Sequence, residues 1–270
     1  MTNPEFVGVP ERWWGEFTFK PHTMGCWQVG PLQLWAQCLE GEWRIAWRSG
    51  EELMQPVAEV TLNLAPAPLQ AGMNVSRFSF REPVKPLRLV PALADRPVVV
   101  KPDIPFFIPA GEAITLFVST PIWVRVFIGN GAEPLLEIPT LRPSDTWFGP
   151  NTRTGELCYA SRTLAHTRVE EIMPRPHRAI TPVRIRNDAG SALAVERLSV
   201  PVPLLILGAN ERGQLWTQSL TLERRARSDN ASLQLGDMTL PGNAILQPIS
   251  GPRQVEDERT VLRALSRFFG

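Results

Sequence analysis

Proline is the residue that most constrains the fold of this chain, because 27 of its 270 residues are proline. Proline fixes φ and removes a backbone N–H donor, so long helices and uninterrupted central strands rarely contain it. The prolines are densest at 83–109, where they separate short extended pieces at 98–101 and 104–108. Short β-branched and aromatic runs between prolines are typical of many short strands joined by turns. The sequence therefore predicts an all-β, mainly β fold.

A hairpin near the N-terminus is the clearest local element. Residues alternate in polarity along 32–37 and again along 43–48, with a Glu40-Gly41 turn between them. Alternation with a period of two around a glycine turn is typical of an antiparallel hairpin. Further strands are expected at 59–64, 114–119, 122–128, 204–207, 215–222, 232–235 and 244–247.

Two consecutive units are expected from an internal similarity. Residues 108–122 and 185–202 share one order of features: a strand end, an Ala-Gly turn, a strand, a Ser-x-Pro break and an apolar strand. This order suggests duplication of one supersecondary unit, although proline and glycine turns also resemble one another by chance. We predict two antiparallel β-sandwich-like units, 1–140 and 141–270, with an inter-unit segment at 141–163.

The last stretch of the chain, 254–269, has a different pattern. Apolar and arginine side chains recur there at spacings of three and four residues, which predicts a C-terminal amphipathic helix. Such a helix packs its apolar side on the protein's own sheet, or meets a partner or a membrane surface. The residues concerned are Leu262, Leu265 and Phe269 on one side, and Arg259, Arg263 and Arg267 on the other.

Charge and cysteine content limit the class of function and the compartment. The formal net charge is +1, so the chain lacks the basic character of a nucleic-acid binder and no nucleic-acid partner is expected. Its three cysteines are odd in number and have no zinc or redox spacing, which argues against a disulfide framework. The N-terminus does not resemble a signal peptide, and the longest apolar runs are too short for a transmembrane segment. We therefore expect a cytoplasmic protein.

No motif indicates a metal, a cofactor or a catalytic centre. His22, His166 and His177 have no ligand spacing among them, and neither a Walker pattern nor a dinucleotide fingerprint occurs. Cys158 and His166 are conceivable as nucleophile and base, but their separation in sequence is no evidence of contact. We expect no metal site and no cofactor, and we assign no catalytic residue.

The segment 142–162 holds the densest run of polar and aromatic residues, and it lies between the two expected units, a common place for ligand sites. Arginines beside aromatic rings can grip an anionic or sugar-like ligand through paired hydrogen bonds and stacking. The candidate ligand- or partner-binding residues are Arg142, Asp145, Trp147, Arg153, Glu156, Tyr159 and Arg162.

Several interpretations of this segment compete. The leading hypothesis is a non-enzymatic binding or interaction protein whose contacts lie in 142–162. An alternative is a hydrolase acting on a sugar or another small polar substrate, with Asp145 and Glu156 as the acid and base, because glycosidases need two carboxylates at set separations. A third is a structural subunit that self-associates through the Trp-rich first hairpin. The plainest interpretation is structural, since polar side chains also satisfy the backbone of a connection between sheets.

The stretches 95–103, 119–124 and 147–159 resemble those of an uncharacterised family of archaeal and bacterial proteins, catalogued only as a domain of unknown function. The resemblance covers nearly the whole chain. The family has no established catalytic residues, so none is carried over. The resemblance implies an association with mechanosensitive-channel genes, and hence a protein partner at a membrane complex.

Overall fold

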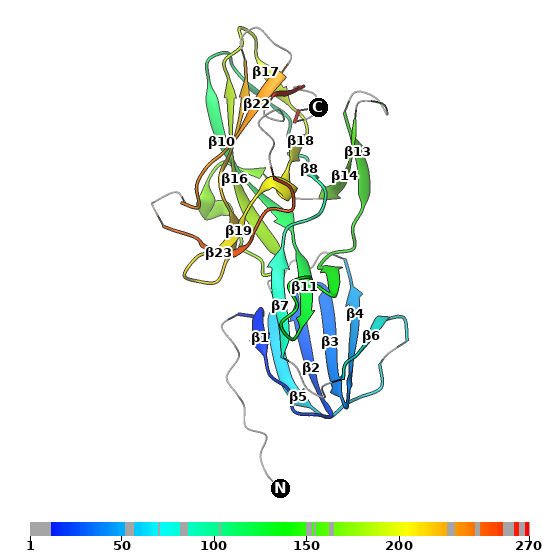
Figure 1. The fold of residues 1–270 in the computed structure, drawn as a ribbon. Helices are drawn as coiled ribbons and strands as arrows, with labels where there is room; N and C mark the ends of the chain where they lie inside the picture. The colour runs from blue at the N-terminus through cyan, green and yellow to red at the C-terminus, as the bar shows by residue number, and fades with distance from the viewer. Residues whose placement is uncertain are drawn as a thin grey trace. The chain divides into compact units, whose positions relative to one another are not determined.

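The computed structural model describes residues 12–51, 57–69, 71–81, 86–102, 104–149, 153, 155–161, 165–225, 230–240, 244–255, 262–264 and 268–269. These residues are mostly β, with several antiparallel sheets, so the predicted fold class is confirmed (Figure 1). The helical elements among them are two single-turn 3-10 helices, η1 (Val169–Glu171) and η2 (Val202–Leu204). None of the described helices is long and apolar enough to cross a membrane.

The chain forms two compact units. The first comprises the described residues up to Val90 together with Val124–Leu141, and the second comprises Pro91–Trp123 and the residues from Arg142 onward. The segment 91–123 thus belongs with the second unit, although it precedes part of the first in sequence. A domain boundary near residue 140 stays a prediction.

The first unit holds a five-stranded sheet, in the order β5-β2-β3-β4-β6, and a four-stranded sheet, in the order β1-β7-β11-β12. Strands β7 and β11 each cross the division between the units. The strands are β1 (Gly15–Phe17), β2 (Thr23–Val29), β3 (Leu32–Leu39), β4 (Glu42–Ser49), β5 (Ala58–Leu64), β6 (Asn74–Ser79), β7 (Leu87–Ala92), β11 (Trp123–Ile128) and β12 (Leu136–Pro139).

The predicted first hairpin is strands β3 and β4, which pair over their full length from Leu32↔Ser49 to Leu39↔Glu42. Gly41 takes a φ of 67° in the turn, a conformation that glycine adopts without steric cost. The inward face of this sheet is aromatic: Phe17 meets Trp27 edge-on with ring centroids 5.2 Å apart, and Phe19 meets Trp43 at 5.1 Å. Both tryptophans are buried, so the alternation in the sequence marks the core side of the sheet.

The second unit is built around β16, which pairs antiparallel with β10 from Ala113↔Arg186 to Pro121↔Arg178 and parallel with β20 and β21. Its further sheets have the orders β13-β14-β8-β18 and β17-β9. The strands are β8 (Val98–Val100), β9 (Phe106–Ile108), β10 (Ala113–Pro121), β13 (Asp145–Phe148), β14 (Glu156–Ser161), β15 (Ala165–His166), β16 (Arg178–Asn187), β17 (Leu193–Val195), β18 (Leu198–Val200), β19 (Leu207–Ala209), β20 (Leu215–Thr217), β21 (Leu220–Arg224), β22 (Asn230–Leu235), β23 (Gln247–Ser250) and β24 (Leu262–Ala264).

The two segments of the internal similarity both lie in the second unit. Residues 108–122 contain the single nine-residue strand β10, whereas 185–202 contain the two short strands β17 and β18. Their strand patterns therefore differ, although their sequences share turn and proline positions.

The C-terminal amphipathic helix predicted over 254–269 is wrong where the structure describes those residues. Leu262–Ala264 form strand β24, which pairs antiparallel with β22 and extends the nine-stranded sheet that contains β16, β21 and β22. Phe269 forms a bridge with Leu198, and both Phe268 and Phe269 are buried. The open edge of β22 supplies backbone hydrogen-bond partners, which a sequence periodicity of three and four residues does not reveal. The stretches 256–261 and 265–267 lie outside the described residues.

Candidate functional site

The predicted binding segment contains an antiparallel hairpin of strands β13 and β14. The register pairs Asp145 with Tyr159, Trp147 with Leu157 and Phe148 with Glu156. Strand β14 also pairs in parallel with β8, from Tyr159↔Val98 to Ser161↔Val100, so the hairpin is attached to the second unit along one side. Figure 1 shows the pair in green beside β8 and β18.

The two faces of the hairpin differ in character, because paired residues share a face and neighbours along a strand alternate. One face carries Asp145 and Tyr159, followed by Trp147 and Leu157. The other face is anchored in the unit: Phe148 packs in a buried cluster with Val99 and Cys158. The first face is therefore the one on which the large side chains of Trp147 and Leu157 are exposed.

Tyr159 is the centre of a polar and aromatic network on this face, which we call the Tyr159 network and which comprises Asp95, Arg96, Trp123, Asp145 and Tyr159. The Tyr159 hydroxyl donates a hydrogen bond to Asp95 Oδ1 at 3.0 Å, and Arg96 Nη1 donates to Asp145 Oδ1 at 3.1 Å. The Arg96 guanidinium lies 5.2 Å from the Tyr159 ring centroid, and the Trp123 ring lies 5.3 Å from it. Burial and the hydrogen bond to Asp95 raise the pKa of Tyr159 to about 12, so the phenol stays protonated and donates.

Trp147 and Leu157 form an exposed apolar pair next to this network. Their exposed fractions are 39% and 41%, high for large apolar side chains. The indole lies over Gly155, where an added Cβ would collide with Nε1 of Trp147. Gly149 has a φ of +132° and sits so close to the Gly155 backbone that only glycine fits there. The two glycines thus determine how the hairpin end presents the indole.

The structure brings together Asp145, Trp147 and Tyr159 of the seven predicted residues. Glu156 shares a face with Phe148, opposite to Asp145, so the geometry gives no support to an acid–base pair made of these two carboxylates. Arg142 and Arg153 have exposed side chains. Arg162 lies outside the described residues.

Sequence reasoning missed three members of the Tyr159 network, namely Asp95, Arg96 and Trp123. Asp95 and Arg96 immediately precede Pro97 and strand β8. Only the parallel pairing of β8 with β14 brings them beside Tyr159, and nothing local in the sequence signals that pairing.

The proposed nucleophile and base, Cys158 and His166, are not activated as such a pair. Burial raises the pKa of the Cys158 thiol to about 11, which disfavours the reactive thiolate. His166 lies on β15, with Nδ1 3.5 Å from Glu171 Oε2. Within the described ranges, no group of three or more His, Cys, Asp or Glu side chains could hold a metal ion.

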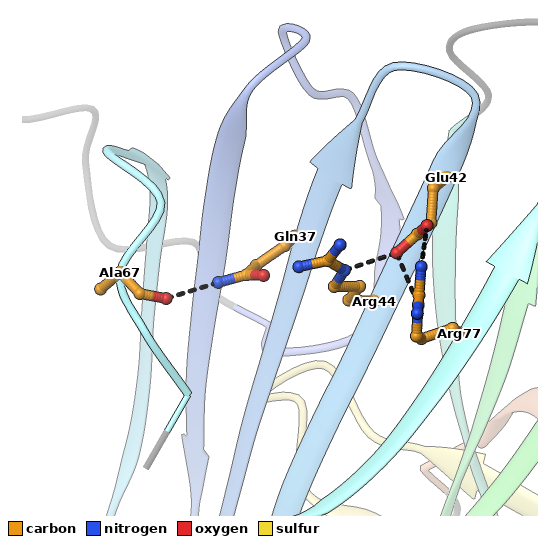
Figure 2. Close-up of polar contacts among 5 residues, drawn as sticks. All are labelled: Gln37, Glu42, Arg44, Ala67 and Arg77. Atoms are coloured by element: carbon orange, nitrogen blue, oxygen red, sulfur yellow. Dashed lines mark hydrogen bonds and ion pairs between the residues drawn. The ribbon is translucent and has the colours of Figure 1, made fainter.

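A second polar arrangement lies on the five-stranded sheet of the first unit, and Figure 2 shows it. Glu42 accepts hydrogen bonds from Arg77, at 2.9 Å from Nε and 2.6 Å from Nη2, and a further one from Arg44 Nε. These hydrogen bonds, first from Arg77 and then from Arg44, lower the pKa of Glu42 to about 2. Beside them the buried Gln37 donates from Nε2 to the Ala67 carbonyl at 2.7 Å.

Comparison with known proteins identifies the family of this chain. No curated protein and no solved structure is similar to this chain. A family described as "Protein of unknown function (DUF432)" matches residues 13–268, nearly the whole chain. The resemblance that the sequence indicated is thereby confirmed, and the chain belongs to the DUF432 family.

Proposed function

We propose that the protein is a non-enzymatic binding protein that acts in the cytoplasm beside a membrane complex, and that its partner is a protein held by the hairpin β13–β14. The observation that carries the proposal is the exposed Trp147–Leu157 pair next to the Tyr159 network. Tryptophan is strongly enriched among the few residues that dominate the free energy of protein–protein binding.

The Tyr159 network supports this proposal because its contacts hold in place the strands that carry Trp147 and Leu157. Tyr159 is fixed by its hydrogen bond to Asp95 and by contact with the Trp123 ring, and Arg96 fixes the neighbouring Asp145. A surface that is already ordered loses less conformational entropy on binding, so more of the contact free energy appears as affinity. The ion pair beside the apolar pair also supplies the polar rim that such interfaces have.

The architectural part of the proposal is that each unit is β-sandwich-like. Contact between Phe17 of β1 and Trp27 of β2 supports it in the first unit, because these strands belong to different sheets. Sheets that face each other across such aromatic side chains leave their hairpin ends available for binding.

Site-specific photo-crosslinking in the native host tests the proposed surface. A benzophenone amino acid replaces Leu157 in one variant and Ile245 in a matched control, since Ile245 is also an exposed apolar residue of the second unit. Membrane and soluble fractions are analysed separately by mass spectrometry.

We expect one protein to crosslink from position 157, to be absent from the position 245 sample, and to be enriched in the membrane fraction. Adding Trp147→Ala to the position 157 variant should reduce that crosslink at least about tenfold, in line with the loss of a dominant interface residue. Identical crosslinked proteins from both positions would refute the hairpin as a specific surface.

A further inference from the structure

Strand β6 is an edge of the five-stranded sheet in the first unit. It pairs antiparallel with β4 from Glu42↔Ser79 to Trp47↔Asn74, and within the described residues it has no partner strand on its other side. Figure 1 shows β6 beside β4 at the margin of that sheet. An edge strand presents a row of backbone groups to which another chain can pair.

The hydrogen-bond pattern identifies which residues of β6 present those groups. The Phe80 N–H donates to the Gly41 carbonyl at 2.8 Å, which makes 41 and 80 a hydrogen-bonded pair. Such pairs recur at every second residue, so Asn74, Ser76 and Phe78 point their backbone groups at β4. The N–H and C=O groups of Val75, Arg77 and Ser79 consequently point away from β4, outward from the edge of the sheet.

The side chains of Val75, Arg77 and Ser79 lie on the outward face of the sheet, and this face also carries arginines of β4. Strands β4 and β6 carry Arg44, Arg48 and Arg77, and one carboxylate, Glu42. The registers place Arg44 directly beside Arg77, with Glu42 bridging them (Figure 2). The Arg77 side chain is 64% exposed even with this bridge. This edge therefore has a net positive charge and complements an acidic ligand.

We propose that the β6 edge binds an extended acidic segment of a protein partner as an added strand. The backbone groups of Val75, Arg77 and Ser79 supply the main-chain hydrogen bonds, and a carboxylate of the segment lies beside Arg77, with Arg44 and Arg48 on the next strand adding to the positive charge. Main-chain pairing of this kind gives affinity, while the alternating side chains give specificity. The exposed Val75 offers an apolar contact next to Arg77 on the same face.

Charge selects this occupant over a second copy of the chain. Antiparallel pairing of two β6 edges would bring the arginines of both copies to one edge, and like charges across strands are destabilising. An acidic strand meets the opposite situation, since the carboxylate opposite residue 77 gains Arg77 as its neighbour and no like charge. Strand β6 belongs to the first unit, whereas the hairpin β13–β14 belongs to the second.

The test uses the full chain and a labelled synthetic peptide of about eight residues that alternates glutamate with valine. The control peptide carries lysine in place of glutamate. Binding is measured by fluorescence anisotropy, and amide hydrogen exchange locates the bound strand. Val75→Pro removes an outward N–H without removing a hydrogen bond to β4, which makes it tolerable at an edge. Val75→Ala retains the N–H and is its matched control.

We expect the glutamate peptide to bind, to slow exchange at residues 75, 77 and 79, and to bind Val75→Pro at least about tenfold more weakly than Val75→Ala. Arg77→Glu should reverse the preference, so that the lysine peptide binds better. The proposal is overturned if no binding occurs up to millimolar peptide, or if Val75→Pro and Val75→Ala bind equally well. Sedimentation showing a dimer that Val75→Pro abolishes would assign the edge to a second copy and overturn it as well.

Discussion

Asn187 allows the sharpest test of how the second unit is held together. This residue ends β16 and is fully buried. Its Nδ2 lies 2.9 Å from the carbonyl oxygen of Ile108, 3.1 Å from that of Pro109 and 2.8 Å from that of Ser191. Because Ile108 ends β9 and Ser191 lies just before β17, one side chain ties both strands of the β9–β17 ribbon to the end of β16.

These contacts determine how much unfolding free energy the second unit loses in Asn187→Ala. An amide nitrogen has two hydrogens, so about two of the three carbonyl contacts are made at full strength at any time. Each buried hydrogen bond contributes about 1 kcal/mol net, and a buried carbonyl left without a donor adds a further penalty. We expect the free energy of unfolding of the second unit to fall by about 2–4 kcal/mol.

Native-state hydrogen exchange read by mass spectrometry is the suitable assay, because a chain with two units need not unfold in one step. Peptides that cover β9 and β17 should exchange faster in Asn187→Ala, and peptides from β3 and β4 should not. Ser191→Ala is the control, since it keeps the carbonyl that Asn187 contacts and should cost less than about 0.5 kcal/mol. A loss below about 1 kcal/mol in Asn187→Ala would refute the role assigned to this side chain.

Three further predictions concern protonation and the hairpin end. The pKa of Glu42 is lowered from its ordinary value of 4.5 to about 2, so the stabilisation from its arginine neighbours is complete above pH 4.5 and is lost as the pH falls towards 2. The chemical shift of the Glu42 carboxyl carbon, followed against pH, should give this lowered pKa, and Arg77→Gln should raise it. Tyr159 is the single tyrosine, so ultraviolet titration reports it alone and should give a pKa near 12, with an ordinary value near 10 contradicting the network. Gly155→Ala should displace the Trp147 indole and shift the nuclear magnetic resonance signal of its indole N–H, whereas an unchanged signal would contradict the close approach.

Local pattern predicted the first hairpin well because both of its determinants are local. Alternation fixes which side of each strand is buried, and the Glu40-Gly41 turn fixes the register between β3 and β4. Neighbours distant in sequence could not be predicted in this way. Strand β5 follows β4 along the chain but pairs with β2, and β6 takes the place beside β4. Such choices depend on tertiary packing, which also explains why 262–264 adds to the edge of β22 instead of forming a helix.

In the candidate site, composition predicts which residue types are present, but only the strand register determines which of them lie together. The sequence shows carboxylates, arginines and aromatic rings in 142–162, but it does not tell which of them share a face of the hairpin. In the hairpin, paired residue numbers sum to 304, so odd-numbered residues share one face and even-numbered residues share the other. Asp145 therefore lies with Trp147 and Tyr159, while Glu156 lies on the opposite face. A reaction that needs two carboxylates around one bond is poorly served by this arrangement. An exposed indole beside a fixed ion pair is well suited to holding a partner, which is why the hairpin is best tested first as a binding surface.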